Sequence, residues 1–97
     1  MGREYYVYIL SNKTRTMVYV GVTADLERRY EEHLNHIFPN SFTARYDVTT
    51  LVYYETFDHV DDAIAREKQI KSWKRWRKNR LVESLNPRWV DLTREEP

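Results

Sequence analysis

The 97-residue sequence contains no cysteine, only two glycines and three prolines, and no long apolar run. Without cysteine, neither a disulfide nor a thiolate zinc site can stabilise the chain, and its three histidines show no zinc-ligand spacing. No stretch approaches the roughly 18 apolar residues of a membrane span, and the N-terminus lacks the apolar core of a signal peptide. We therefore expect a soluble, cytoplasmic protein that contacts no membrane.

Internal repeats, low-complexity tracts and linker-like segments are also missing. The length suffices for one modest hydrophobic core, so we expect a single domain over 1–97 that acts as a monomer. The formal net charge of +1 does not by itself indicate a nucleic-acid partner. The distribution of charge along the chain is more informative than its sum.

Two short runs near the N-terminus, 5–10 and 17–22, are rich in β-branched and aromatic residues and enclose a polar, turn-prone segment. This pattern predicts a β-hairpin with a longer loop. Side chains alternate between the two faces of a strand, so Tyr8 and Tyr19 can lie on one face beside Gly21. A glycine at that place leaves room for a ligand.

The rest of the chain predicts three helices and a third strand. The first helix starts at Thr23 or Asp25 and buries Leu26, Tyr30, Leu34 and Ile37, and a loop follows from about 38 to 50. A strand over 51–57 precedes a helix over 60–72, which Asp58 caps and which buries Val60, Ala63, Ile64 and Ile70. The last helix runs from Trp73 or Lys74 to Leu85, where Asn86-Pro87 ends it. The order β-β-α-β-α-α is typical of an α+β fold in which helices flank a three-stranded antiparallel sheet.

Glu67 lies among apolar residues on the predicted core stripe of the helix over 60–72. Acidic side chains are almost never fully buried without a partner. Two interpretations are open from the pattern alone. Glu67 either lies at the edge of the stripe and pairs with Arg66, Lys71 or a neighbouring arginine, or it has a functional role.

The segment 66–80 carries eight of the sixteen Lys and Arg residues, and only Glu67 opposes them. Charge runs on helices are commonly solvated faces, but this segregation in a nearly neutral chain favours a phosphate-tracking surface. The candidate nucleic-acid contacts are Lys68, Lys71, Lys74, Arg75 and Lys78. The interleaved Trp73 and Trp76 either pack in the core or stack on bases. Nothing in the run indicates base-edge readout, so we expect recognition of shape or phosphate.

Tyr6-Val7-Tyr8 and Tyr19-Val20-Gly21, followed by Arg29, Glu67 and Asn86, resemble the motifs of the GIY-YIG nuclease superfamily. The resemblance spans nearly the whole chain and is greatest to the small stand-alone bacterial proteins of that superfamily. It implies the same β-β-α-β-α-α architecture. Two departures are present. Tyr6 replaces the glycine of the first motif, and Val22 stands where the repair nucleases of the family carry a lysine, which implies a slower or more selective enzyme.

The resemblance also implies roles for individual residues. Glu67 would hold one Mg²⁺ or Mn²⁺ ion, and Arg29 would bind the scissile phosphate. Tyr19 would take the proton of the attacking water, directly or through a hydroxide on the metal, while Tyr8 positions the water or the phosphate. His33, one helical turn after Arg29, either moves a proton, contacts phosphate or is structural.

Three further residues are candidates by the same resemblance. Thr43 and Arg45 match a loop segment of the stand-alone group and could touch substrate. Asn86 either supports the active site through hydrogen bonds or caps the last helix.

The sequence thus predicts a Mg²⁺-dependent endonuclease that acts on branched, nicked or single-stranded DNA in repair or processing, with RNA still open as a substrate. One alternative is a catalytically weak nucleic-acid-binding module with the same fold. Another is a subunit whose basic helix docks on an acidic protein partner.

Overall fold

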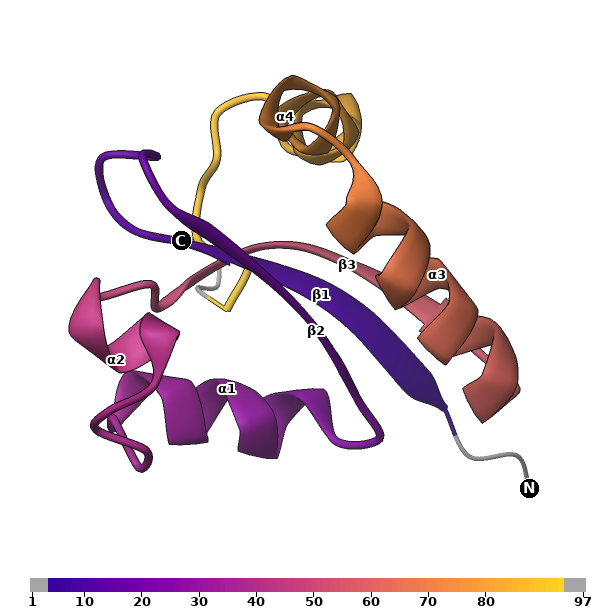
Figure 1. The fold of residues 1–97 in the computed structure, drawn as a ribbon, viewed down its shortest axis with the longest axis horizontal. Helices are drawn as coiled ribbons and strands as arrows, with labels where there is room; N and C mark the ends of the chain where they lie inside the picture. The colour runs from indigo at the N-terminus through magenta and orange to yellow at the C-terminus, as the bar shows by residue number, and fades with distance from the viewer. Residues whose placement is uncertain (1–3, 94–97) are drawn as a thin grey trace.

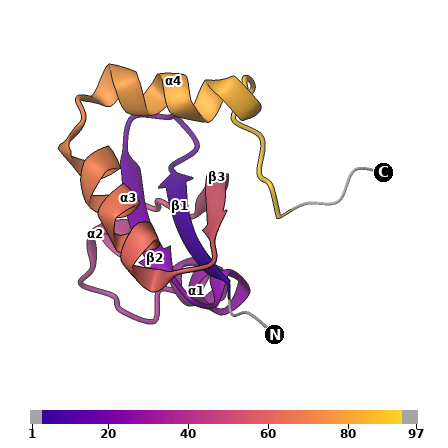
Figure 2. The ribbon, with the colours of Figure 1, turned by 90° about the vertical axis from the view of Figure 1, so that its right-hand side faces the viewer.

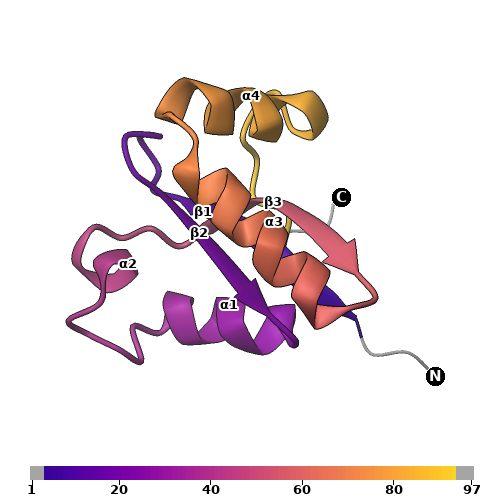
Figure 3. The same ribbon diagram turned by 45° about the vertical axis from the view of Figure 1, so that its right-hand side comes forward.

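The computed structural model describes residues 4–93, which form a three-stranded sheet with helices on both faces (Figure 1). The elements are β1 (Tyr5–Ser11), β2 (Val18–Thr23), α1 (Leu26–Leu34), α2 (Phe42–Arg45), β3 (Thr50–Phe57), α3 (Val60–Ser72) and α4 (Arg75–Leu85). The sheet is antiparallel with strand order β2-β1-β3. Helices α1 and α2 lie on one side of it and α3 and α4 on the other (Figures 1 and 3). The predicted α+β fold is confirmed.

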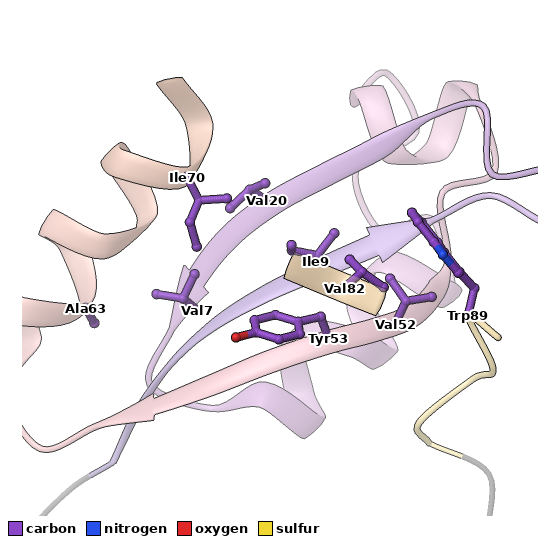
Figure 4. Close-up of a cluster of buried hydrophobic side chains, with 9 residues drawn as sticks. All are labelled: Val7, Ile9, Val20, Val52, Tyr53, Ala63, Ile70, Val82 and Trp89. Atoms are coloured by element: carbon purple, nitrogen blue, oxygen red, sulfur yellow. The ribbon is translucent and has the colours of Figure 1, made fainter. Parts of the chain in front are cut away.

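The N-terminal hairpin has the predicted alternation of faces. In the β1–β2 register Tyr8 pairs with Gly21, and Leu10 pairs with Tyr19. Val7 and Ile9 point to the α3 face, where they join the larger core cluster drawn in Figure 4. Tyr8 and Leu10 point to the α1 face and belong to a second buried cluster. Both faces of β1 are therefore buried, as expected for the central strand of a sheet covered on both sides.

A bulge in β3 allows this strand to serve both clusters. Ile9 pairs with Tyr53 and Leu10 pairs with Leu51, so Val52 is the extra residue in the ladder. As a result Val52 and Tyr53 both point into the larger cluster, while Leu51 points into the cluster around Tyr8.

Two predicted core stripes differ from the structure. Val60 and Ile64 are exposed, because α3 contacts the sheet along the line Ala63–Glu67–Ile70 and Ile64 lies about 100° around the helix from Ala63. On the other side, α1 ends at Leu34, and both Leu34 and Ile37 are exposed. The first-helix stripe was therefore predicted one turn too long.

Helix starts were predicted with mixed success. Asp25 caps α1 by accepting a hydrogen bond from the Arg28 amide. Asp58 does not cap α3, since His59 occupies the N-cap position without a side-chain bond. The predicted loop over 38–50 contains the one-turn helix α2, which starts because the Ser41 hydroxyl accepts the Ala44 amide.

Helix α4 lies across the end of the sheet at which the β1–β2 loop emerges (Figure 2). Arg75, the first residue of α4, donates hydrogen bonds to the carbonyls of Arg15 and Thr16 in that loop. Within residues 4–93, no helix combines the length and the apolar character that crossing a bilayer requires.

Candidate active site

Tyr8 and Gly21 form the centre of the candidate site. The Tyr8 ring extends across β2 directly over Gly21, so that a Cβ on Gly21 would lie 2.8 Å from Tyr8 Cε1 and still closer to Cζ and Oη. Gly21 does not have a left-handed backbone. Its lack of a side chain is therefore required for space, and the space it leaves is filled by the Tyr8 phenol.

Three aromatic rings meet above this glycine. Tyr8 Oη lies 3.0 Å from His33 Nε2, and the Tyr19 and His33 ring centroids are 5.3 Å apart. The Tyr8 and Tyr19 centroids are separated by 6.2 Å. The structure thus brings together both predicted tyrosines and His33, which belongs to the last turn of α1.

The environment of these rings sets their protonation. Burial, followed by the neighbouring Tyr19 phenol, raises the pKa of Tyr8; the charge of Arg29 opposes this rise and that of Glu67 adds to it. Burial and then the charge of Arg29 lower the pKa of His33, against a smaller opposing effect of Glu32. At neutral pH Tyr8 is therefore a neutral phenol, and His33 is a neutral imidazole.

Arg29 is placed to receive an anion. Its side chain is 39% exposed and makes one long ion pair with Glu32, at 3.6 Å. Such a half-exposed pair is weak, so the guanidinium can exchange this partner for a phosphate.

Glu67 has the unusual position that the sequence indicated. It lies on the α3 stripe between the buried Ala63 and Ile70, and its side chain is only 13% exposed. Lys71 Nζ pairs with its carboxylate at 2.9 Å, whereas Arg66 pairs with Glu55 instead. Within residues 4–93, no three ligand-type side chains gather in one place. The donor set is one shielded carboxylate, which fits Mg²⁺, an ion that keeps several of its waters.

The predicted basic contacts are divided between two roles. Lys68, Lys71 and Lys74 are exposed, and burial together with the charges of Arg75 and Lys71 lowers the pKa of the half-buried Lys78. Arg75 itself is engaged in holding the β1–β2 loop and also donates to Asn79 Oδ1. Its guanidinium therefore has a structural role.

The two tryptophans of the run also differ. The Trp73 ring packs against the core and has the guanidinium of Arg77 at 4.1 Å and that of Arg66 at 5.3 Å from its centroid. Trp76 is 59% exposed. Of the two, Trp76 is the one available to a nucleobase.

Thr43 and Asn86 both have structural partners. Thr43 is buried, with its hydroxyl 2.9 Å from His33 Nδ1, so it lies beneath the site and not on a substrate-facing loop. Asn86 is the C-cap residue of α4, and its side chain bonds the carbonyls of Val52 and Val90. Asn86 therefore occupies the cap position through its backbone, while its side chain joins β3 to the C-terminal segment. Arg45 is exposed, with its guanidinium 5.7 Å from the Tyr46 ring centroid.

The link between Thr43 and His33 was missed from the sequence. The available signal was Ser41, a strong N-cap residue two positions after Pro39, which marks a helix start in the segment predicted as a loop.

Comparison with known proteins identifies this arrangement. The GIY-YIG catalytic domain family matches residues 4–80, and the chain belongs to this family of nucleases. The curated relatives are UPF0213 proteins. One from Haloquadratum walsbyi is 37% identical over 86% of this chain and 91% of its own, and one from Natronomonas pharaonis is 39% identical over 84% and 94%.

A solved structure agrees with the fold. The solution structure of a UPF0213 protein from Bacillus halodurans has a TM-score of 0.58 at 28% identity, covering 93% of this chain and 94% of that one. The chain is thus similar to the small UPF0213 group within the GIY-YIG family.

Proposed function

We propose that this chain is a metal-dependent endonuclease that hydrolyses phosphodiester bonds in DNA, with branched, nicked or single-stranded forms as substrates. The observation that carries the proposal is the cluster of Tyr8, Tyr19 and His33, in which the charges of both Arg29 and Glu67 act on Tyr8. A cationic group that offsets charge on the phosphate, a shielded carboxylate that can hold a metal ion and two neighbouring phenols are a set of groups able to carry out phosphoryl transfer.

The reaction assigns one task to each side chain. Arg29 binds the scissile phosphate and offsets the charge that develops on it. Tyr19, half-buried at the site, would accept the proton of the attacking water in its phenolate form and so become the neutral phenol. Tyr8 positions the reactants from the buried side. Glu67 would hold one Mg²⁺ or Mn²⁺ ion, which supplies charge stabilisation for the leaving 3′ oxygen.

The exposed lysines of α3, together with Lys74 at the N-cap of α4, supply binding. Lys68 and Lys74 have no acidic partner among the described residues, and Lys71 reaches the Glu67 carboxylate. A cationic surface that ends at the proposed metal ligand leads the phosphate backbone to the cleavage site. Arg45 extends the same role on the α2 side.

A second candidate is a nucleic-acid-binding module with little turnover. Two observations favour it. The Glu67 carboxylate is paired with Lys71, so a metal ion must displace Lys71 to bind there. The residue after Gly21 is the uncharged Val22, where the repair nucleases of the family carry a lysine.

Cleavage of a substrate panel distinguishes these candidates. Branched, nicked, single-stranded and fully duplex DNA, with matched RNAs, should be incubated with the protein and either Mg²⁺, Mn²⁺ or EDTA. The proposal expects metal-dependent cutting of at least one non-duplex DNA. Binding of the panel without cutting under every metal condition supports the module instead.

A further inference from the structure

Helix α2 places a hydroxyl group directly under the imidazole of the site. Thr43 is 2% exposed, and its Oγ1 lies 2.9 Å from His33 Nδ1 and 3.2 Å from Ser41 Oγ. Ser41 Oγ in turn accepts the Ala44 amide. A continuous chain of hydrogen bonds therefore runs from the half-buried Ser41 through Thr43 and His33 to the Tyr8 phenol.

The hydrogen bonds of this series can point in either of two directions, because a neutral imidazole has one donor and one acceptor. In the first, Tyr8 O–H donates to His33 Nε2, and Nδ1–H donates to Thr43. In the second, Thr43 O–H donates to Nδ1, and Nε2–H donates to Tyr8. The first arrangement pairs the better acid, a phenol, with the better acceptor, an imidazole nitrogen. It also leaves the Thr43 hydrogen free for Ser41 Oγ.

We infer that Thr43 is a positioning residue, which accepts the Nδ1 hydrogen of His33 and so makes Nε2 the acceptor for the Tyr8 hydroxyl hydrogen. This is the same logic by which a third group orients the base of a catalytic pair. With its hydrogen directed at His33, the Tyr8 oxygen offers only lone pairs to the substrate side.

The direction of the Tyr8–His33 hydrogen bond determines whether the Tyr8 oxygen can bind the attacking water or a phosphate oxygen. A phenol oxygen that only accepts hydrogen bonds can bind the attacking water through one of its hydrogens, whereas a phosphate oxygen would need a donor. Tyr8 therefore positions water, and the contact to phosphate is left to Arg29. This assignment rests on the proposed function; the hydrogen-bond polarity itself does not.

Nitrogen-15 NMR of the imidazole side chains measures the tautomer without any substrate. The spectra should be recorded above the His33 titration range on the full chain, on Thr43→Val, on Thr43→Ser and on Thr56→Val. Valine keeps the shape of threonine but cannot accept a hydrogen bond, and Thr56 is an exposed β3 position that serves as the matched control. We expect the Nδ1–H tautomer in the parent, in Thr43→Ser and in Thr56→Val, and a shift to Nε2–H in Thr43→Val.

Cleavage of the best panel substrate tests the consequence for the reaction. Thr43→Val should lower kcat by about 10- to 100-fold with little change in KM, the range found for hydrogen-bond partners of metal-ligating histidines, and Thr43→Ser should restore most of it. If Thr43→Val does not fold, the His33 tautomer of the parent protein and the cleavage rate of Thr43→Ser still test the inference.

The outcomes of these experiments distinguish the inferred role of Thr43 from the proposed nuclease activity. An Nε2–H tautomer in the parent, or an unchanged tautomer in a folded Thr43→Val, overturns the inference even if the protein cuts DNA. The expected tautomers in a protein that cuts nothing support the role of Thr43, while the nuclease proposal fails separately.

Discussion

The Tyr8 ring occupies the space above Gly21 that any larger side chain at position 21 would need. Tyr8 is 2% exposed, so its ring cannot simply move into solvent. The glycine and the tyrosine of the two motifs are therefore one packing unit, although they belong to different strands.

Gly21→Ala should therefore destabilise the protein. The added methyl group must displace the Tyr8 ring, and overpacking of this kind costs about 1–3 kcal/mol of the free energy of unfolding. Chemical denaturation measures the loss. In a Tyr8→Leu background the same alanine should cost much less, and equal costs in both backgrounds would show that the ring is not the obstacle.

Glu67→Gln should abolish metal-dependent cleavage and leave DNA affinity in EDTA nearly unchanged, because the amide is a poorer ligand for a hard cation. Cleavage and binding assays with and without Mg²⁺ check this. Asp62→Asn makes the same carboxylate-to-amide change on an exposed turn of α3 and should have no effect on cutting. Loss of folding in Glu67→Gln would favour a structural role in the Lys71 pair.

Tyr19→Phe removes one oxygen and keeps the ring, so strand packing should survive. If this phenol accepts the proton, the cleavage rate should fall by roughly 10²–10⁴-fold. Tyr8→Phe should cost less, and the two effects should not add, because both rings adjoin His33. Single-turnover kinetics on the same substrate measure both, and a Tyr19→Phe variant as fast as the parent would exclude the proposed base.

Lys68→Glu combined with Lys74→Glu should weaken DNA binding and reduce its dependence on salt. Each phosphate contact removed lowers the slope of log K against log salt by about one unit. Titrations at several salt concentrations give the slope. Arg88→Glu, an exposed charge change outside the basic run, is the control, and an unchanged slope in the double variant would exclude both lysines as phosphate contacts.

Folding stability should depend on the protonation of His33. Because burial and Arg29 lower the pKa of His33 in the folded state, the unfolded chain binds the proton more readily. The contribution of neutral His33 is complete above about pH 6.5, the ordinary value of the unfolded imidazole, and is lost as pH falls below it. Between about pH 7 and about pH 5, the free energy of unfolding should thus decline more steeply for the parent than for His33→Gln. The remaining histidines, His36 and His59, are common to both proteins, so parallel curves would contradict the expectation.

The hairpin and its tyrosines were predictable because a strand has a period of two. Once the two runs were identified, the shared face of Tyr8, Tyr19 and Gly21 followed from counting. Glu67 was noticeable for the same kind of reason, as an acid on an apolar helical stripe. Local periodicity thus placed Tyr8, Tyr19 and Glu67, whereas the other candidate catalytic residues were indicated only by the family resemblance.

Contacts across distant segments were not predictable in this way. The bond from His33 to Thr43 joins α1 to a helix of one turn, which is too short to have a periodic pattern. Arg75 reads as one more charge in a basic run, and only the fold brings the β1–β2 loop against it. The exposure of Val60 and Ile64 depends on how α3 crosses the sheet, which a helical pattern does not specify.

Because the Asn86 side chain joins β3 to the C-terminal segment, the part of the chain that must fold together is longer than the family match. The family match ends at residue 80, yet Val82 and Trp89 fill the larger core cluster, and the Asn86 side chain binds the Val52 carbonyl in β3. A fragment cut where the match ends would leave that carbonyl unpaired and open the apolar α3 face of the sheet to solvent. Such a fragment would keep every motif residue up to Glu67 and still be prone to aggregate, because the segment that seals the core comes after residue 80, where the family match ends.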